Sequence, residues 1–258
     1  MNAAQCQHAE KRMLHVIKPD EIHIWWARTD LPAWDPSHMA SLVSDDEKAR
    51  AGRFHFLRDQ RRFIMVHGIL RTMLGVYLGR RPAGLKFLNS PKGKPRLDDA
   101  GAGAELCFNL SHSWNLAVFG IALNRQIGVD VEHIRPFSNM ASIAGCYFSE
   151  SERNAILDTP PNERDRIFFL YWTIKEAYLK ATGEGLSGLK EIRISDDVIG
   201  AHPNKPLLIA DDSNQLWTVC PIHTVSGYAT AFAVEGNGAV NPILRGCPSG
   251  LRQGSFPP

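Results

Sequence analysis

The amino-acid sequence predicts an α+β protein composed of two similar halves, and three observations support this prediction. Each half contains a strand, then helices that begin with capping residues, then several more strands. The 258 residues suffice for one large domain or two small ones, each with its own core. The hydrophobic fraction of 44% and the charged fraction of 22% are typical of globular proteins and exclude disordered, collagen-like and coiled-coil chains.

The first half is expected to begin with a short strand at Ile22–Trp26. Ser44 and Glu47 have the spacing of a capping box, in which each side chain binds the other residue's backbone N–H at the start of a helix. The helical pattern that follows continues to about Leu74, with an interruption near Arg58-Asp59. Three further strands are expected, at Lys86–Leu88, Leu106–Leu110 and Leu116–Leu123.

The second half is expected to begin with a strand at Ile127–Glu132. Ser149 and Glu152 repeat the capping-box spacing at the start of a helix. A long helix at Arg164–Ala181 should end at Gly183, because glycine readily adopts the left-handed conformation of a helix C-cap. Four more strands are expected, at Glu191–Ser195, Leu207–Ala210, Leu216–Pro221 and Tyr228–Val234.

The join between the halves is placed near residue 118. This divides the chain into an N-terminal α+β half at 1–118 and a C-terminal α+β half at 119–236. Residues 237–258 are rich in glycine and proline, and we predict that they form a disordered tail.

Charge and cysteine content narrow the class of protein. A formal net charge of +2 argues against a dedicated nucleic-acid coat. Five cysteines, far apart and without a CxxC pair, suit a reducing compartment better than a disulfide framework. The N-terminus lacks the apolar region of a secretory signal, and no run of 18 apolar residues could span a membrane. We therefore expect a soluble, cytoplasmic monomer that binds neither nucleic acid nor a membrane.

Two acidic residues lie on one face of the strand at Ile127–Glu132. Side chains alternate along a strand, so Asp130 and Glu132 point to the side opposite Val129 and Val131. Alone, this pattern favours a half-buried strand with a solvated acidic face. The functional alternative is a pair of carboxylates that offers oxygen ligands to Mg²⁺.

The long helix at Arg164–Ala181 carries a second candidate group. Trp172, Glu176 and Lys180 are four residues apart and lie along one stripe. A Glu–Lys pair at this spacing is usually a solvent-exposed pair worth about 0.3–0.5 kcal/mol. The helix is largely apolar, however, and a charge close to buried surface needs a partner or a function.

Basic residues form two more candidate groups, and each has a structural alternative. The first is an arginine cluster interleaved with aromatic residues, which fits phosphate or RNA binding as well as an ordinary amphipathic helix face. It comprises Arg50, Arg53, Arg58, Arg61, Arg62 and Arg71. The second combines the turn at residues 92–95 with the strand end at residues 109–113, where a glycine would let backbone N–H groups approach an anion. A structural turn and a histidine with an ordinary hydrogen-bond partner are the alternative there.

The sequence does not support a serine hydrolase or a dinucleotide-binding loop. No GxSxG elbow surrounds Ser111 or Ser113, so a serine hydrolase is not supported. Residues 183–188 match GxGxxG but follow a helix instead of a strand, which excludes a dinucleotide-binding loop.

In their order and spacing, the four groups together resemble the Sfp-type 4′-phosphopantetheinyl transferases, from about Ser44 to Val234. The most specific parts of the resemblance are residues 127–132 and 172–186. The resemblance implies two similar α+β halves in one chain, with coenzyme A bound in the cleft between them. It also implies Mg²⁺-dependent transfer of 4′-phosphopantetheine from coenzyme A to a serine of an apo acyl or peptidyl carrier protein, with release of 3′,5′-ADP.

The resemblance also assigns roles to residues of the second half. Asp130, Glu132 and Glu176 match the magnesium-binding acids of the family, and Lys180 matches its lysine near the pyrophosphate. Glu176 is our candidate general base for the serine hydroxyl, and Lys180 would stabilise charge as the pyrophosphate ester breaks.

Residues that match the coenzyme A contacts come mostly from the first half: Arg50, Arg62, Lys92, Lys94, Ser111 and His112. Arg50 and Arg62 would approach the 3′-phosphate. Glu47 departs from the pattern, because some relatives have a lysine at that position. An acidic helix of the carrier protein is expected near Phe137–Phe148. A nucleic-acid-binding module and a Mg²⁺-dependent phosphohydrolase are the alternative functions.

Overall fold

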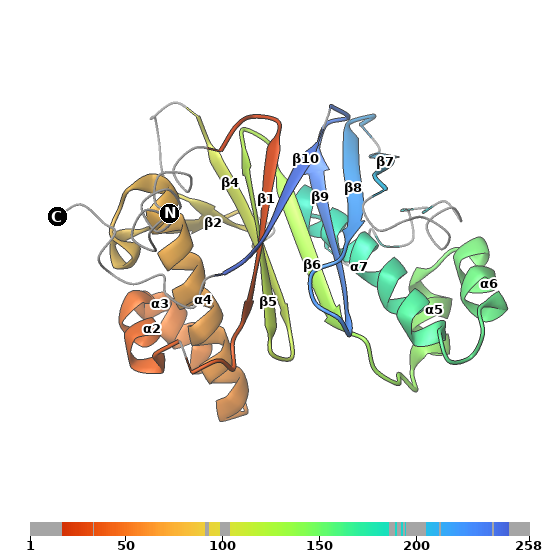
Figure 1. Ribbon diagram of the computed structural model, residues 1–258, viewed down its shortest axis with the longest axis horizontal. Helices are drawn as coiled ribbons and strands as arrows, with labels where there is room; N and C mark the ends of the chain where they lie inside the picture. The colour runs from red at the N-terminus through yellow and green to blue at the C-terminus, as the bar shows by residue number, and fades with distance from the viewer. Residues whose placement is uncertain are drawn as a thin grey trace, which may run out of the picture.

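A computed structural model describes residues 17–32, 34–90, 93–98, 104–185, 205–211, 213–238 and 240–247, together with Leu189, Ile192 and Ile194. The described elements form four layers, in which two sheets lie face to face and helices cover the outer side of each (Figure 1). The protein is therefore α+β with two halves, as predicted.

The first sheet has the strand order β10-β1-β5-β4. Its strands are β1 (Glu21–Arg28), β4 (Leu106–Ser113), β5 (Leu116–Leu123) and β10 (Asn241–Gly246). Helices α2 (Pro36–Leu42), α3 (Asp45–Ala51) and α4 (Leu57–Leu78) lie on its outer side (Figure 1). A short 3₁₀ helix (Pro82–Gly84) and the hairpin of β2 (Phe87–Asn89) and β3 (Pro95–Leu97) connect α4 to β4.

The second sheet has the strand order β6-β9-β8-β7. Its strands are β6 (Ile127–His133), β7 (Leu207–Ala210), β8 (Leu216–Ile222) and β9 (Tyr228–Glu235). Helices α5 (Met140–Tyr147), α6 (Glu150–Asp158) and α7 (Arg164–Thr182) cover it. The order β6-β9-β8 repeats the order β1-β5-β4 of the first sheet, so the two halves share one topology.

Three hydrophobic clusters hold the four layers together. One lies between α4 and the first sheet, with Ile69 fully buried, and another lies between α7 and the second sheet, with Ile174 fully buried. The third joins the sheets to each other and includes Val118 and Val129, both fully buried. Because this cluster takes side chains from both sheets, the halves share a continuous core.

The local signals at the helix ends behave as predicted. Both capping boxes form, with Ser44 and Glu47 at α3 and Ser149 and Glu152 at α6, each with the two reciprocal hydrogen bonds. Gly183 ends α7 with a φ of 75°, the left-handed conformation that glycine adopts without strain. The expected interruption of the first helical pattern lies at residues 52–56, slightly before the predicted position.

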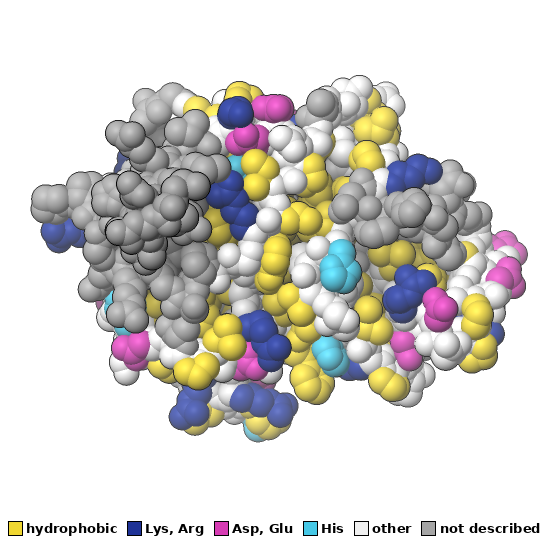
Figure 2. All heavy atoms as spheres, viewed as in Figure 1, with side chains coloured by type: hydrophobic (Ala, Val, Ile, Leu, Met, Phe, Trp, Pro, Cys, Tyr) yellow, Lys and Arg dark blue, Asp and Glu magenta, His cyan; other side chains and the backbone are white. Residues whose placement is uncertain are grey.

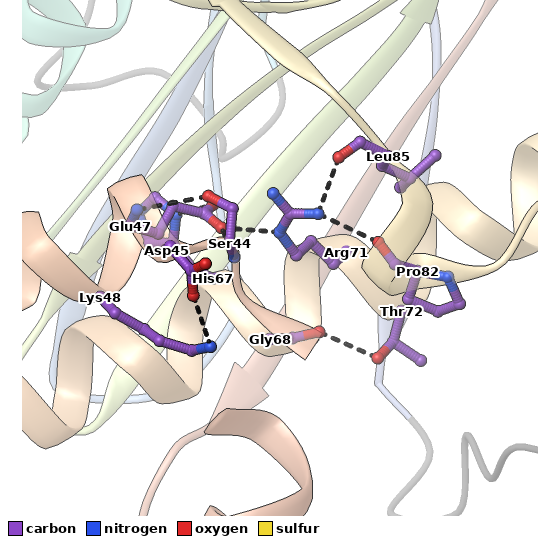
Figure 3. A network of polar contacts seen from close by, with 10 residues as sticks. All are labelled: Ser44, Asp45, Glu47, Lys48, His67, Gly68, Arg71, Thr72, Pro82 and Leu85. Atoms are coloured by element: carbon purple, nitrogen blue, oxygen red, sulfur yellow. Dashed lines mark hydrogen bonds and ion pairs between the residues drawn. The ribbon is translucent and has the colours of Figure 1, made fainter. Parts of the chain in front are cut away.

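Behind each capping box lies a buried cation from the long helix of the same half. Arg71 of α4 donates to Glu47 Oε2 at 2.7 Å and to the carbonyl oxygens of Pro82 and Leu85 (Figure 3). In the second half, Lys175 of α7 lies 2.8 Å from Glu152.

Lys175 also donates to the carbonyl oxygens of Leu189 and Ile192, beyond the end of its helix. The same polar network therefore occurs twice, which is further structural support for the duplication. In each half it ties the short capped helix and the chain after the long helix to one buried charge.

Replacing Glu47 by glutamine is expected to lower the free energy of unfolding by about 3 kcal/mol at neutral pH. Burial opposes ionisation of Glu47, but hydrogen bonds from His67 and from the Ser44 backbone and the charge of Arg71 lower its pKa from 4.5 to about 2. A lowered folded-state pKa contributes stability above pH 4.5 that is lost as pH falls toward 2. The wild type and Glu47→Gln should therefore differ less in their free energy of unfolding, measured with urea, below pH 5.

The matched control for this prediction is Asp45→Asn in the first turn of the same helix. The Asp45 side chain is fully exposed and pairs with Lys48 across the surface. Asp45→Asn should therefore change the free energy of unfolding little at any pH. A Glu47→Gln difference that does not vary with pH would show that the network stabilises the fold by packing alone.

Two sequence predictions about chain organisation need correction. The boundary near residue 118 falls inside β5, and the chain crosses to the second sheet at residues 124–126 instead. The tail at 237–258 is not disordered throughout, because Asn241–Gly246 forms β10 in parallel pairing with β1. Figure 1 shows this blue strand beside the red β1, so the end of the chain returns to the first half. The strand expected at Glu191–Ser195 lies mostly outside the described residues.

Candidate active site

A row of polar side chains crosses the boundary between the halves, where β4 faces β6. Ser111 Oγ donates to Asp130 Oδ1 at 2.8 Å, and Ser113 Oγ donates to Glu132 Oε2 at 2.8 Å. Asn109 Oδ1 accepts a hydrogen bond from the Val129 backbone. Alternate residues of β4 thus contact β6, because a strand directs every second side chain to the same face.

Helix α7 contributes the cation of this site. Lys180 Nζ lies 2.6 Å from Asp130 Oδ1 and donates to Ser111 Oγ at 2.9 Å. Lys180 therefore binds the strand acid in preference to forming an ordinary surface pair along the helix. The predicted acids and lysine are brought together from two elements separated by about forty residues in sequence.

The close approach of α7 to β6 depends on Gly128. A Cβ atom at this position would lie 2.1 Å from the Ala177 carbonyl oxygen and 2.3 Å from the Ala181 nitrogen. Only a residue without a side chain allows the helix backbone to pack directly on the strand. As a result, the side chains on this stripe of α7 reach the face of β6 that bears Asp130.

Burial and the repulsion between neighbouring carboxylates raise the pKa of two acids in this site. Burial, and after it the charge of Asp130, raises the pKa of Glu176 to about 7, although Lys180 acts in the opposite direction. Burial and Asp130 also raise the pKa of Glu132. A carboxylate that titrates near neutrality has the proton affinity that a general base needs.

The chemistry of these donors fits a divalent cation. Asp130 Oδ2 and Glu176 Oε1 are buried and have no hydrogen-bond partner within the described part of the chain. Unpaired carboxylate oxygens are the ligands that Mg²⁺ prefers. No three His, Cys, Asp or Glu side chains among the described residues are already arranged as a metal site. Oxygen ligands from a bound molecule would have to complete the coordination.

Lys94 lies at the end of the polar row where β6 begins. Its Nζ donates to the Ala181 carbonyl oxygen at 2.8 Å and to Gln126 Oε1 at 3.0 Å. Burial lowers its pKa to about 8. Lys94 thus connects the first half to the end of α7. Lys92, the other predicted lysine of this turn, lies outside the described residues.

His112 lies on the opposite face of β4 from Ser111 and Ser113. The residue as a whole is exposed, but partial burial of the imidazole ring, and then the positive charges of Arg62 and Lys180, lower its pKa. The ring is therefore neutral at pH 7, and an anion bound beside it would favour its protonation.

The predicted arginine cluster does not form a single surface. Arg71 is buried in the polar network behind the capping box, while Arg62 on α4 lies close enough to His112 to affect its charge. Arg50 is exposed, with its guanidinium 5.5 Å from the centre of the Phe63 ring. Figure 2 shows basic and hydrophobic side chains gathered at the lower end of the molecule, where α4 begins in Figure 1.

Glu47 stands where some relatives have a lysine, and its partners here are residues of the same half. It caps α3 and binds both His67 and Arg71, so it anchors the helix that carries Arg50. The expected carrier contacts at Phe137–Phe148 are also partly internal, because Phe148 is only 4% exposed and packs in the core under α7.

Known families match almost the entire described fold. A family model described as "4′-phosphopantetheinyl transferase, N-terminal" matches residues 32–122, and one described as "4′-phosphopantetheinyl transferase superfamily" matches residues 126–233. The 4′-phosphopantetheinyl transferase HetI of Nostoc sp. is 41% identical over 219 residues, which cover 85% of this chain and 90% of HetI. The chain belongs to the 4′-phosphopantetheinyl transferase superfamily.

More distant relatives agree with this assignment. The 4′-phosphopantetheinyl transferase Sfp of Bacillus subtilis is 28% identical over 57% of this chain and 63% of its own length. An L-aminoadipate-semialdehyde dehydrogenase-phosphopantetheinyl transferase of Xenopus laevis is 28% identical over 72% of this chain and 68% of its own length. The enzyme class predicted from the sequence is thus confirmed, and the nucleic-acid-binding and phosphohydrolase alternatives receive no support from these relatives.

Two residues that organise the candidate site, Ser113 and Gly128, had no predicted role there. Ser113 holds Glu132, and its position two residues after Ser111 was the available signal, because both point to the same face of a strand. Gly128 allows the close contact with α7, and a glycine inside a strand is itself a signal of close backbone approach.

Proposed function

We propose that this transferase moves 4′-phosphopantetheine from coenzyme A to the acceptor serine of an apo acyl or peptidyl carrier protein. The observation that supports this most directly is the contact of Lys180 with Asp130 and Ser111 across the boundary between the halves. In this contact Lys180 and the buried Asp130 of the second half meet Ser111 of the first half. Such an arrangement suits transfer of a phosphoryl-linked group from an anionic pyrophosphate to a serine hydroxyl.

Glu176 acts as the general base in the proposed reaction. It accepts the proton of the serine hydroxyl while the serine oxygen bonds to the β-phosphorus of coenzyme A. The bond from that phosphorus to the bridging oxygen breaks, and 3′,5′-ADP leaves with the bonding electron pair. Lys180 donates toward the pyrophosphate oxygens and stabilises their developing charge. Without a bound cation, burial and the charge of Asp130 raise the pKa of Glu176, so this carboxylate holds a proton more readily than an exposed one.

We also propose that Asp130, Glu132 and Glu176 hold Mg²⁺ when coenzyme A is bound. The unpartnered oxygens of Asp130 and Glu176 support this assignment. The cation would neutralise charge on the pyrophosphate. Ser111 and Ser113 orient Asp130 and Glu132 through their hydrogen bonds, so that the acids keep their positions when the substrate enters.

The nucleotide part of coenzyme A is assigned to the first half. Arg50, Arg62 and His112 would bind the 3′-phosphate, and the charge of Arg62 already acts on the His112 imidazole. Lys94 would approach the nucleotide beside the start of β6, and the resemblance assigns a coenzyme A contact to Lys92 as well. These groups mainly position the substrate, which matters because phosphoryl-group transfer depends largely on alignment and electrostatics.

Mass spectrometry of an apo carrier protein incubated with the enzyme, coenzyme A and Mg²⁺ tests the proposed function. We expect the carrier to gain one phosphopantetheine group on its serine, with one 3′,5′-ADP released for each carrier modified. A carrier lacking that serine is the control. Hydrolysis of coenzyme A with an unmodified carrier would contradict the proposal.

Two further expectations concern assembly and location. We propose that the enzyme acts as a monomer in the cytoplasm, since the site is completed by the two halves of one chain. Within the described residues, no helix is long and apolar enough to cross a membrane.

A further inference from the structure

The hairpin between β4 and β5 carries an unusual residue at its tip. Ser113 pairs with Leu116, so the loop consists of only Trp114 and Asn115. Trp114 has a φ of 50°, whereas Asn115 is not among the described residues with positive φ. In two-residue hairpin loops, this first position is typically a glycine. A tryptophan there strains the backbone, and such strain is usually retained for function.

Trp114 forms an aromatic shelf with His133 and Tyr228. The rings of Trp114 and His133 are stacked, with centroids 4.6 Å apart, and Tyr228 meets the His133 ring edge-on at 5.1 Å. His133 of β6 and Tyr228 of β9 are also paired in register. The shelf therefore takes one residue from the first half and two from the second, as the active site does.

The shelf lies at the same end of β6 as Glu132 but on the opposite face of the strand, because the side chains of Glu132 and His133 alternate. Along β6, Gln126 binds Lys94, Asp130 binds Ser111, and Glu132 binds Ser113. The next residue of β6 is His133, which Trp114 covers. Lys94 and the shelf thus lie at opposite ends of the polar row. If coenzyme A occupies the Lys94 end, the acceptor serine has to reach the acids from the other end.

One face of Trp114 remains free for a partner. His133 covers the inner face of the ring, yet the residue as a whole is 53% exposed. Part of the Trp114 side chain is therefore accessible to solvent. Arg135 donates to the His133 carbonyl oxygen, lies 3.9 Å from Glu132 Oε2 and packs over the Phe169 ring, and its side chain remains 37% exposed. A tryptophan with a neighbouring arginine is the typical composition of a protein-binding hot spot.

We propose that the aromatic shelf is the docking surface for the carrier protein and that Trp114 determines acceptor specificity. Its open face receives an apolar side chain next to the acceptor serine, and Arg135 attracts acidic groups on the carrier. This inference rests on the proposed function. It assigns the shelf to the protein substrate, because coenzyme A is assigned to the opposite end of β6, where Lys94 binds Gln126.

Steady-state kinetics of Trp114→Gly test this proposal. We expect the KM for the carrier to rise about tenfold or more, which is the size typical of a lost hot-spot residue. The KM for coenzyme A and the kcat at saturating carrier should stay within twofold. The melting temperature should not fall, because glycine relieves the strain at positive φ. Arg62→Gln is the matched control, and it should raise the KM for coenzyme A without changing the KM for the carrier.

A binding measurement separates this proposal from the proposed function. Calorimetry with a carrier whose acceptor serine is replaced by alanine requires no turnover, and Trp114→Gly should weaken that binding about tenfold. Trp114→Phe should restore most of it. Absence of transfer by the wild type would refute the proposed function alone. An unchanged carrier affinity, or an increased KM for coenzyme A in place of the carrier, would overturn the assignment of the shelf.

Discussion

Glu176→Gln is expected to lower kcat for carrier modification by about 10²–10⁴-fold, the usual contribution of a general base. The loss should persist at saturating Mg²⁺, because glutamine keeps the size of the side chain but cannot accept the serine proton. The structure supports this expectation, since Glu176 Oε1 is buried and unpartnered and its pKa is raised to about 7. Transfer rates across a Mg²⁺ titration provide the measurement.

Asp130→Asn is the matched control, because it removes a proposed metal ligand without removing the base. Its defect should be partly rescued by raising the Mg²⁺ concentration. If Glu176 were only the partner of an exposed Lys180, Glu176→Gln would cost at most about 0.5 kcal/mol and leave transfer nearly unchanged. Near-wild-type rates would refute the assignment. Full rescue by Mg²⁺ would restrict Glu176 to metal binding.

Gly128→Ala is expected to impair both the fold and the active site. The added Cβ would lie 2.1 Å from the Ala177 carbonyl oxygen, where ordinary contacts begin at 3.4 Å, so α7 must move by about 1 Å. Such overpacking against a rigid backbone costs about 1–3 kcal/mol or more. The same shift would carry Glu176 and Lys180 away from Asp130, and a misplacement of about 1 Å can lower the transfer rate about 10²-fold.

Gly145→Ala provides the control for this glycine. Gly145 lies in α5, and a Cβ atom there would have no atom within 4 Å. An alanine inside a helix should leave the rate unchanged and raise stability by about 0.5–1 kcal/mol. Urea unfolding and transfer assays on both variants are the measurements. Wild-type stability and rate in Gly128→Ala would show that α7 does not need its close contact with β6.

Local signals were sufficient for most elements of the fold. The strand at Leu116–Leu123 and the helix at Arg164–Ala181 agree with the structure to within a residue, as do both capping boxes. Each depends on residues that are close in sequence. The strand Asn241–Gly246 was missed because its composition resembles a disordered segment, and its partner β1 lies more than 200 residues earlier. Pairing of that kind leaves little trace in a local pattern.

The sequence by itself determined the fold class, the duplicated topology and the enzyme family, because alternation, capping and motif spacing are properties of the chain. It also singled out Asp130, Glu132, Glu176 and Lys180. Only the tertiary structure decided which groups meet: Lys180 binds Asp130 and Ser111, while the adjacent cation of the same motif, Lys175, is buried in the opposite direction. The distance between α7 and β6 depends on packing across the core, and here it depends on the absence of a side chain at Gly128. No local pattern of side chains specifies the distance between a helix and a strand.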